Sequence, residues 1–84
     1  MRRLEAVMDQ HGYTDAGLAR QLGVSGVTIT LMRNETRSPG AVLALQIEQL
    51  FDGAIRAEQL VKKAKAKREL GMLRGWLASH GVSG

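Results

Sequence analysis

Glycine and proline divide this chain of 84 residues into short segments whose apolar residues recur at helical spacing. No segment alternates apolar and polar residues as a half-buried strand does. We therefore expect an all-helical fold, with Thr14 and Ser25 as N-caps of two helices and Pro39 as the first residue of a third. The expected helices are residues 2–11, 15–22, 26–33, 39–51 and 58–80.

The expected core is aliphatic, because the chain has only one Trp, one Tyr and one Phe. A chain of this size holds a single small core, and the lack of cysteine excludes disulfides and thiolate zinc sites. In the helix over 39–51, four side chains are expected to pack inward. They are Val42, Leu43, Ile47 and Leu50.

Several classes of protein are excluded early. No apolar run approaches the ~18–20 residues of a membrane-spanning helix. Glu5 and Asp9 interrupt the stretch where a signal peptide needs apolar residues, so we expect a cytoplasmic protein with no membrane partner. No catalytic motif, paired carboxylates or metal-ligand spacing is present, His11 and His80 included. We expect no enzyme activity, cofactor, metal or small-molecule substrate.

Residues 15–34 have the spacing of a helix-turn-helix. Ala19 is small where the two helices would cross, and Gly23 suits the positive φ of the turn between them. Ser25 is placed to cap the second helix. Five apolar residues would hold the unit together, namely Leu18, Leu22, Val24, Ile29 and Met32.

This motif resembles the phage Cro and CI repressor family. The resemblance rests on LARQLGVS at residues 18–25, TIT at 28–30, RN at 33–34 and SP at 38–39, and it covers residues 2–53. It implies a compact bundle of four or five helices whose third helix enters the major groove of double-stranded DNA, with a dimer on a pseudo-palindromic operator. The helix beyond residue 58 is additional to this pattern.

The resemblance also implies two sets of DNA contacts. The family's base-reading positions fall on Asp15, Gly26, Val27, Thr28 and Leu31, and Arg33 at the end of the same helix is expected to reach a guanine or a phosphate. Contacts with the DNA backbone need only donors around the rim of the motif. The candidates are Arg20, Gln21, Ser25, Thr30, Asn34, Arg37 and Ser38. Because only Thr28 is polar among the central positions of the recognition helix, where the family often has Gln, Asn, Arg or Lys, we expect few hydrogen bonds to bases.

The chain divides into an expected DNA-binding domain, 1–53, and a basic helical extension, 54–84. The first has five basic and six acidic residues, or −1, and the second has seven basic and two acidic residues, or +5. We expect the extension to form a homodimer. The expected interface residues are Leu70, Leu73, Trp76 and Leu77, and the possible additional DNA contacts are Arg2, Arg3, Lys62 and Lys63.

Taken together, these patterns predict a sequence-selective DNA-binding transcriptional regulator. It would be a repressor of phage or mobile-element type that excludes polymerase from a promoter as a homodimer. Two alternatives stay open. An oligomer that resembles the small subunit of a phage DNA-packaging terminase has a similar layout, and an adaptor would bind protein through Val27 and Leu31.

Overall fold

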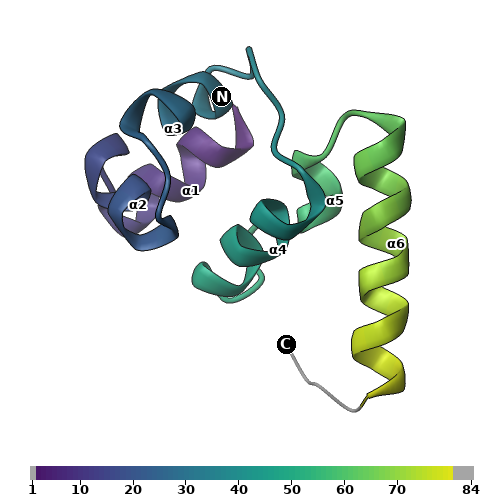
Figure 1. Ribbon diagram of the computed structural model, residues 1–84. Helices are drawn as coiled ribbons and strands as arrows, with labels where there is room; N and C mark the ends of the chain where they lie inside the picture. Colours follow the sequence, from purple (N-terminus) through teal and green to yellow (C-terminus); the bar gives the residue numbers. More distant parts are fainter. Residues whose placement is uncertain (1, 81–84) are drawn as a thin grey trace. The chain divides into compact units, whose positions relative to one another are not determined.

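The protein is all-helical, as expected from the sequence (Figure 1). The structure is a computed structural model that describes residues 2–80, and no strand occurs among them. The helices are α1 (Arg3–His11), α2 (Asp15–Leu22), α3 (Gly26–Arg33), α4 (Ala41–Leu50), α5 (Ala57–Leu60) and α6 (Ala64–Ser79). None of the helices in this range is both long and apolar enough to cross a membrane.

The helices form two compact units. The first unit, Met1–Ser38, contains α1, α2 and α3, and the second unit, Pro39–Gly84, contains α4, α5 and α6. The border expected after Gly53 therefore falls inside the second unit, because α4 packs against α5 and α6. The helix-turn-helix is complete within the first unit.

The first unit is built around an aliphatic core and closed by local capping. Its buried side chains are Leu4, Val7, Met8, Leu18, Ala19, Ile29 and Met32. The Thr14 hydroxyl accepts a hydrogen bond from the Gly17 N–H at 3.0 Å, and the Ser25 hydroxyl accepts one from the Thr28 N–H at 3.2 Å. Both predicted N-caps are confirmed.

The start and the inner face of α4 differ from the prediction. The helix begins at Ala41 with Gly40 as N-cap, so Pro39 precedes the helix and is not its first residue. Its buried residues are Ala41, Ala44, Leu45 and Ile47. The prediction for Val42 is wrong, since this side chain is exposed, and Leu43 and Leu50 are only half-buried. Small alanines, which a hydrophobicity pattern ranks below valine, take the inner positions.

The prediction of a single helix over residues 58–80 is also wrong, because the helical structure is interrupted between α5 and α6. Val61 is extended, with φ −74° and ψ 137°, and both it and Leu60 are buried. Gly71 and Gly75 lie inside α6 and do not interrupt it.

Candidate nucleic-acid interface

The turn between α2 and α3 has the conformation that the helix-turn-helix pattern requires. Gly23 ends α2 in the left-handed region, at φ 71°, and the Val24 N–H donates to the Ala19 carbonyl at 3.0 Å. Ser25 then caps α3 within two residues. As a result α2 and α3 pack against each other across a short turn (Figure 1).

Helix α3 has one buried face and one open face. Ile29 and Met32 are buried, whereas Val27 is 69% exposed. Leu31 lies one turn after Val27 on the same side and is half-buried. The open face is therefore apolar at its centre, as the sequence predicted.

Polar groups at the start of α3 are partly used inside the protein. The Thr28 and Ser25 hydroxyls are 2.9 Å apart and share one hydrogen bond, in which either can be the donor. When Ser25 donates, the Thr28 hydroxyl keeps its own proton for an external acceptor. Gly26 has open space where a Cβ would lie, so a ligand can come close to the backbone there.

Arg33, expected to contact a base or a phosphate, lies in an ion-pair cluster inside the first unit. Its Nε and Nη2 atoms donate to the two carboxylate oxygens of Asp15 at 2.9 and 3.1 Å, and its Nη1 donates to Glu5 at 2.9 Å. Asp15 was also expected to contact DNA, but its carboxylate instead binds Arg33 and holds that side chain in place. Both side chains are more than two-thirds shielded from solvent.

Thr30 belongs to the same cluster. Its hydroxyl lies 2.6 Å from a carboxylate oxygen of Asp15 and 3.1 Å from the Gly26 carbonyl, to either of which it can donate. Its expected contact with the DNA backbone would have to compete with these bonds. Hydrogen bonds from Arg33, and then from Thr30, hold the pKa of Asp15 below its ordinary value. Hydrogen bonds to Asp15, and then to Glu5, raise the pKa of Arg33.

The remaining expected backbone contacts lie at the rim of the helix-turn-helix. Exposed among them are Arg20, Gln21, Ser25, Asn34 and Arg37, while Ser38 is half-buried. Arg2 and Arg3 are also exposed, and Arg2 Nε lies 4.0 Å from a carboxylate oxygen of Glu35. These side chains leave donors at the surface around α3.

The loop after α3 is closed by a Schellman motif with a strained residue. Glu35 has φ 61°, a region that side chains other than glycine rarely adopt. The two bonds of this motif run from the Thr36 N–H to the Leu31 carbonyl at 2.9 Å and from the Glu35 N–H to the Met32 carbonyl at 3.1 Å. The Arg37 N–H also donates to the Leu31 carbonyl, at 3.2 Å. These three amides are engaged, so the side chains of the loop are better placed than its backbone to bind phosphate.

A second ion-pair cluster lies in the second unit, and the sequence did not point to it. Arg74 of α6 donates to both carboxylate oxygens of Glu48 in α4 and to both of Glu58 in α5. Glu48 also accepts the Ala57 N–H at 2.8 Å. Its hydrogen bonds from Arg74 lower the pKa of Glu48 to about 2. Arg74 therefore links α6 to α4 and α5.

The expected dimer interface on α6 is only partly available. Leu70 is 2% exposed and belongs to the core of the second unit, so its assignment to the interface is wrong. It lies on the face of α6 that packs against α4 and α5. Leu73 and Leu77 are half-buried, whereas Trp76 and Met72 are 54% and 69% exposed. Met72 precedes Trp76 by one helical turn.

The spacing of Arg33 from the core residues of α3 indicates on which side of the helix its side chain lies. Arg33 follows the buried Ile29 by four residues, so its side chain leaves α3 near the buried face and not near Val27. Its acidic partners are 18 and 28 residues away along the chain, and no spacing rule links them.

Comparison of this chain with protein-family models, with curated proteins and with solved structures finds no match.

Proposed function

We propose that the protein is a sequence-selective DNA-binding regulator of transcription that resembles the Cro and CI repressors. The observation that carries the proposal is the two-faced α3: Ile29 and Met32 are buried against the unit, and Val27 faces outward beside Leu31. A helix held in this way behind a tight turn can enter a major groove with its open side toward the bases.

In this proposal the bases are read mainly through apolar contacts. Val27 and Leu31 pack against thymine methyl groups, Thr28 offers a hydroxyl, and Gly26 lets the backbone approach. Asp15 and Arg33 act behind this face by fixing α3 against α2. Because apolar contacts distinguish bases less sharply than paired hydrogen bonds do, DNA shape contributes part of the specificity.

The DNA backbone is bound by the exposed rim of the motif. Arg20, Arg37 and Arg3 supply charge, while Gln21 and Asn34 supply neutral donors. Such contacts position the protein without selecting a sequence. They make the affinity fall as salt rises.

A homodimer places two such helices on successive major grooves, about 34 Å apart. Met72 and Trp76, exposed on neighbouring turns of α6, are the apolar side chains that a second copy would cover. A bound dimer that overlaps a promoter represses by excluding polymerase. A ring-sized oligomer in solution would instead favour the DNA-packaging alternative.

Selection of bound sequences from a random DNA pool tests the proposal. The intact chain should enrich a two-fold symmetric motif, and Val27→Ala or Leu31→Ala should change the preferred bases within each half. Val42→Ala is the matched control, because it shortens an exposed valine of α4 outside the helix-turn-helix. Enrichment of no sequence at low salt would overturn the proposal.

A protein-binding adaptor is the second candidate, and the state of Arg33 favours it. With this guanidinium tied to Asp15 and Glu5, the open face of α3 has Val27 and Leu31 at its centre and little charge. An apolar helix face of this kind also suits a protein partner. The adaptor would be supported if the original chain binds no duplex DNA but forms a complex with a protein, and if Val27→Asp loses that complex.

A further inference from the structure

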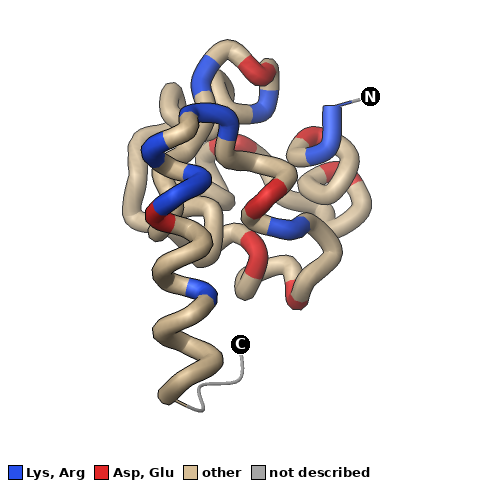
Figure 2. The backbone as a smooth tube through the Cα atoms, turned by 90° about the vertical axis from the view of Figure 1, so that its right-hand side faces the viewer, with Lys and Arg blue, Asp and Glu red and all other residues tan. Residues whose placement is uncertain are grey.

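Five basic residues lie close together where α6 begins. They are Lys62, Lys63, Lys65, Lys67 and Arg68, and this group is called the basic patch below. All five are exposed, and no acidic residue occurs between the first and the last of them. Figure 2 shows the basic residues of α6 concentrated in its first half.

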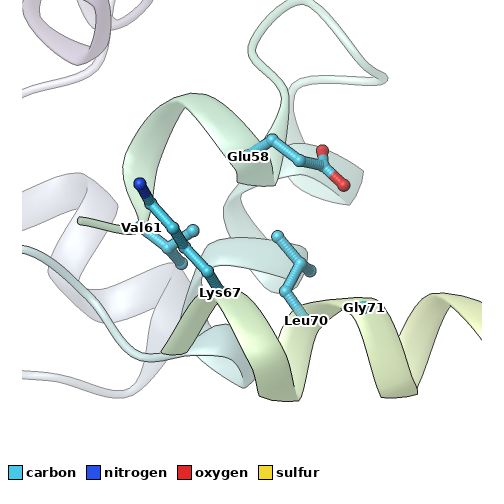
Figure 3. A pocket seen from close by; sticks show the side chains of 5 residues that line it. All are labelled: Glu58, Val61, Lys67, Leu70 and Gly71. Carbon is cyan, nitrogen blue, oxygen red and sulfur yellow. The ribbon is translucent and has the colours of Figure 1, made fainter. Parts of the chain in front are cut away.

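Two carboxylates of the second unit, those of Glu48 and Glu58, are bound by arginines outside the patch. Glu48 and Glu58 are both bound by Arg74, and Arg56 Nε lies 3.5 Å from Glu48 and 3.9 Å from Glu58. Lys67 and Glu58 line the same open pocket of about 310 Å³. Figure 3 shows the Lys67 ammonium group beside Val61 and the Glu58 carboxylate turned to the other side. The ion pairs of this cluster thus come from Arg74 and Arg56 and not from Lys65, Lys67 or Arg68.

The backbone under the patch is held in place on both sides. Leu60 and Val61 are buried before it and Leu70 is buried after it. No side chain caps the N-terminus of α6, whose first turn adds partial positive charge to that of the lysines. A fixed arrangement of cations binds a polyanion at a lower entropic cost than a flexible tail does.

The arrangement of the charges favours nucleic acid over a lipid surface. Lys65 and Lys67 are two residues apart in α6 and therefore lie about 200° apart around its axis. A flat bilayer meets one side of a helix, whereas the phosphates that flank a DNA groove can meet both sides. The residues between the cations are Ala64 and Ala66, which offer no large apolar group for insertion into lipid.

We propose that the basic patch is a second DNA-binding surface, which binds backbone phosphates without regard to sequence. This inference rests on the proposed function, in which the first unit reads the bases. The patch then supplies the salt-sensitive part of the affinity that the apolar face of α3 lacks.

The test compares the intact chain with Lys65→Gln/Lys67→Gln/Arg68→Gln on a short duplex of scrambled sequence, by fluorescence anisotropy over a range of salt concentrations. The matched control is Gln46→Glu/Gln49→Glu/Ala54→Glu, which lowers the net charge equally at exposed positions of the second unit. The patch variant should lose affinity about tenfold or more at low salt, and the slope of log affinity against log salt should fall by about two to three. The control should stay within about twofold.

Equal losses in the two variants would overturn the second surface, because net charge alone would explain them. Val27→Asp separates this result from failure of the proposed function. If only Val27→Asp weakens binding to DNA, the DNA-binding role of the helix-turn-helix is supported and that of the basic patch is overturned. If only the patch variant weakens binding, the patch is supported as a DNA-binding surface and the role of the helix-turn-helix is overturned. Binding to phosphatidylserine-containing vesicles, with no binding to duplex DNA, would overturn both.

Discussion

Arg33, the last residue of α3, donates two hydrogen bonds to Asp15, the first residue of α2. The same guanidinium donates to Glu5 of α1. One side chain therefore joins the three helices of the first unit at the far end of the helix-turn-helix from Gly23. The angle at which α3 would meet DNA depends on this cluster as well as on the turn.

Asp15→Asn should lower the melting temperature by several degrees and leave the base preference unchanged. The substitution keeps the shape of the side chain and removes the charge that Arg33 and Thr30 bind. Circular dichroism at neutral pH measures the melting temperature. Asp9→Asn, at an exposed position of α1, is the control and should melt like the original chain. A changed base preference with an unchanged melting temperature would instead identify Asp15 as a direct DNA contact.

Glu48→Gln should cost about 1–3 kcal/mol of folding free energy, since it weakens hydrogen bonds made to a charged and mostly buried acceptor. Glu58→Gln weakens the other set of hydrogen bonds from Arg74 but changes a residue that is mostly exposed, so its cost should stay below about 1 kcal/mol. Urea unfolding of the two variants makes the comparison. Equal costs would show that the two carboxylates contribute alike.

The same pair predicts the response to acid. Hydrogen bonds from Arg74 lower the pKa of Glu48 from its ordinary value of 4.5 to about 2 in the folded chain, so the unfolded chain binds a proton more readily. The stabilisation is complete above about pH 5 and is lost as the pH falls toward 2. Unfolding free energies measured across this window should decline less steeply in Glu48→Gln than in the original chain. If the two chains lose unfolding free energy equally as the pH falls, the lowered pKa of Glu48 is contradicted.

Features set by local chemistry could be predicted from the sequence, and features set by tertiary contacts could not. The end of α2 at Gly23 and the cap at Ser25 follow from the conformational freedom of one residue and the hydroxyl of another. The break at Val61 is marked by no glycine or proline, and the extended Val61 is held in the core beside Leu60. Arg33 was expected at the DNA because it ends the recognition helix, and its partners Asp15 and Glu5, 18 and 28 residues away, could not be identified from spacing.

Glu35→Gly should stabilise the chain by about 1 kcal/mol. Glu35 has φ 61° at the position after α3 where helices often have glycine, and glycine adopts this conformation without the cost imposed by a Cβ. Glu35→Gln is the control, because it removes the same charge and keeps the side chain on the strained backbone. If both variants gain equally, the charge and not the backbone conformation is responsible.

Truncation of two residues of α6 should lower the stability of the chain by different amounts. Leu70→Ala leaves a cavity in the core of the second unit and should cost about 2–5 kcal/mol, enough to unfold much of a small domain. Trp76→Ala should cost less than about 1.5 kcal/mol, because the exposed indole mainly stacks on His80, with the ring centres 4.1 Å apart. Urea unfolding measures both costs, and sedimentation equilibrium measures self-association.

If α6 forms the homodimer, Trp76→Ala should remain folded and become monomeric. A folded Trp76→Ala chain that dimerises as tightly as the original would place the dimer contact elsewhere.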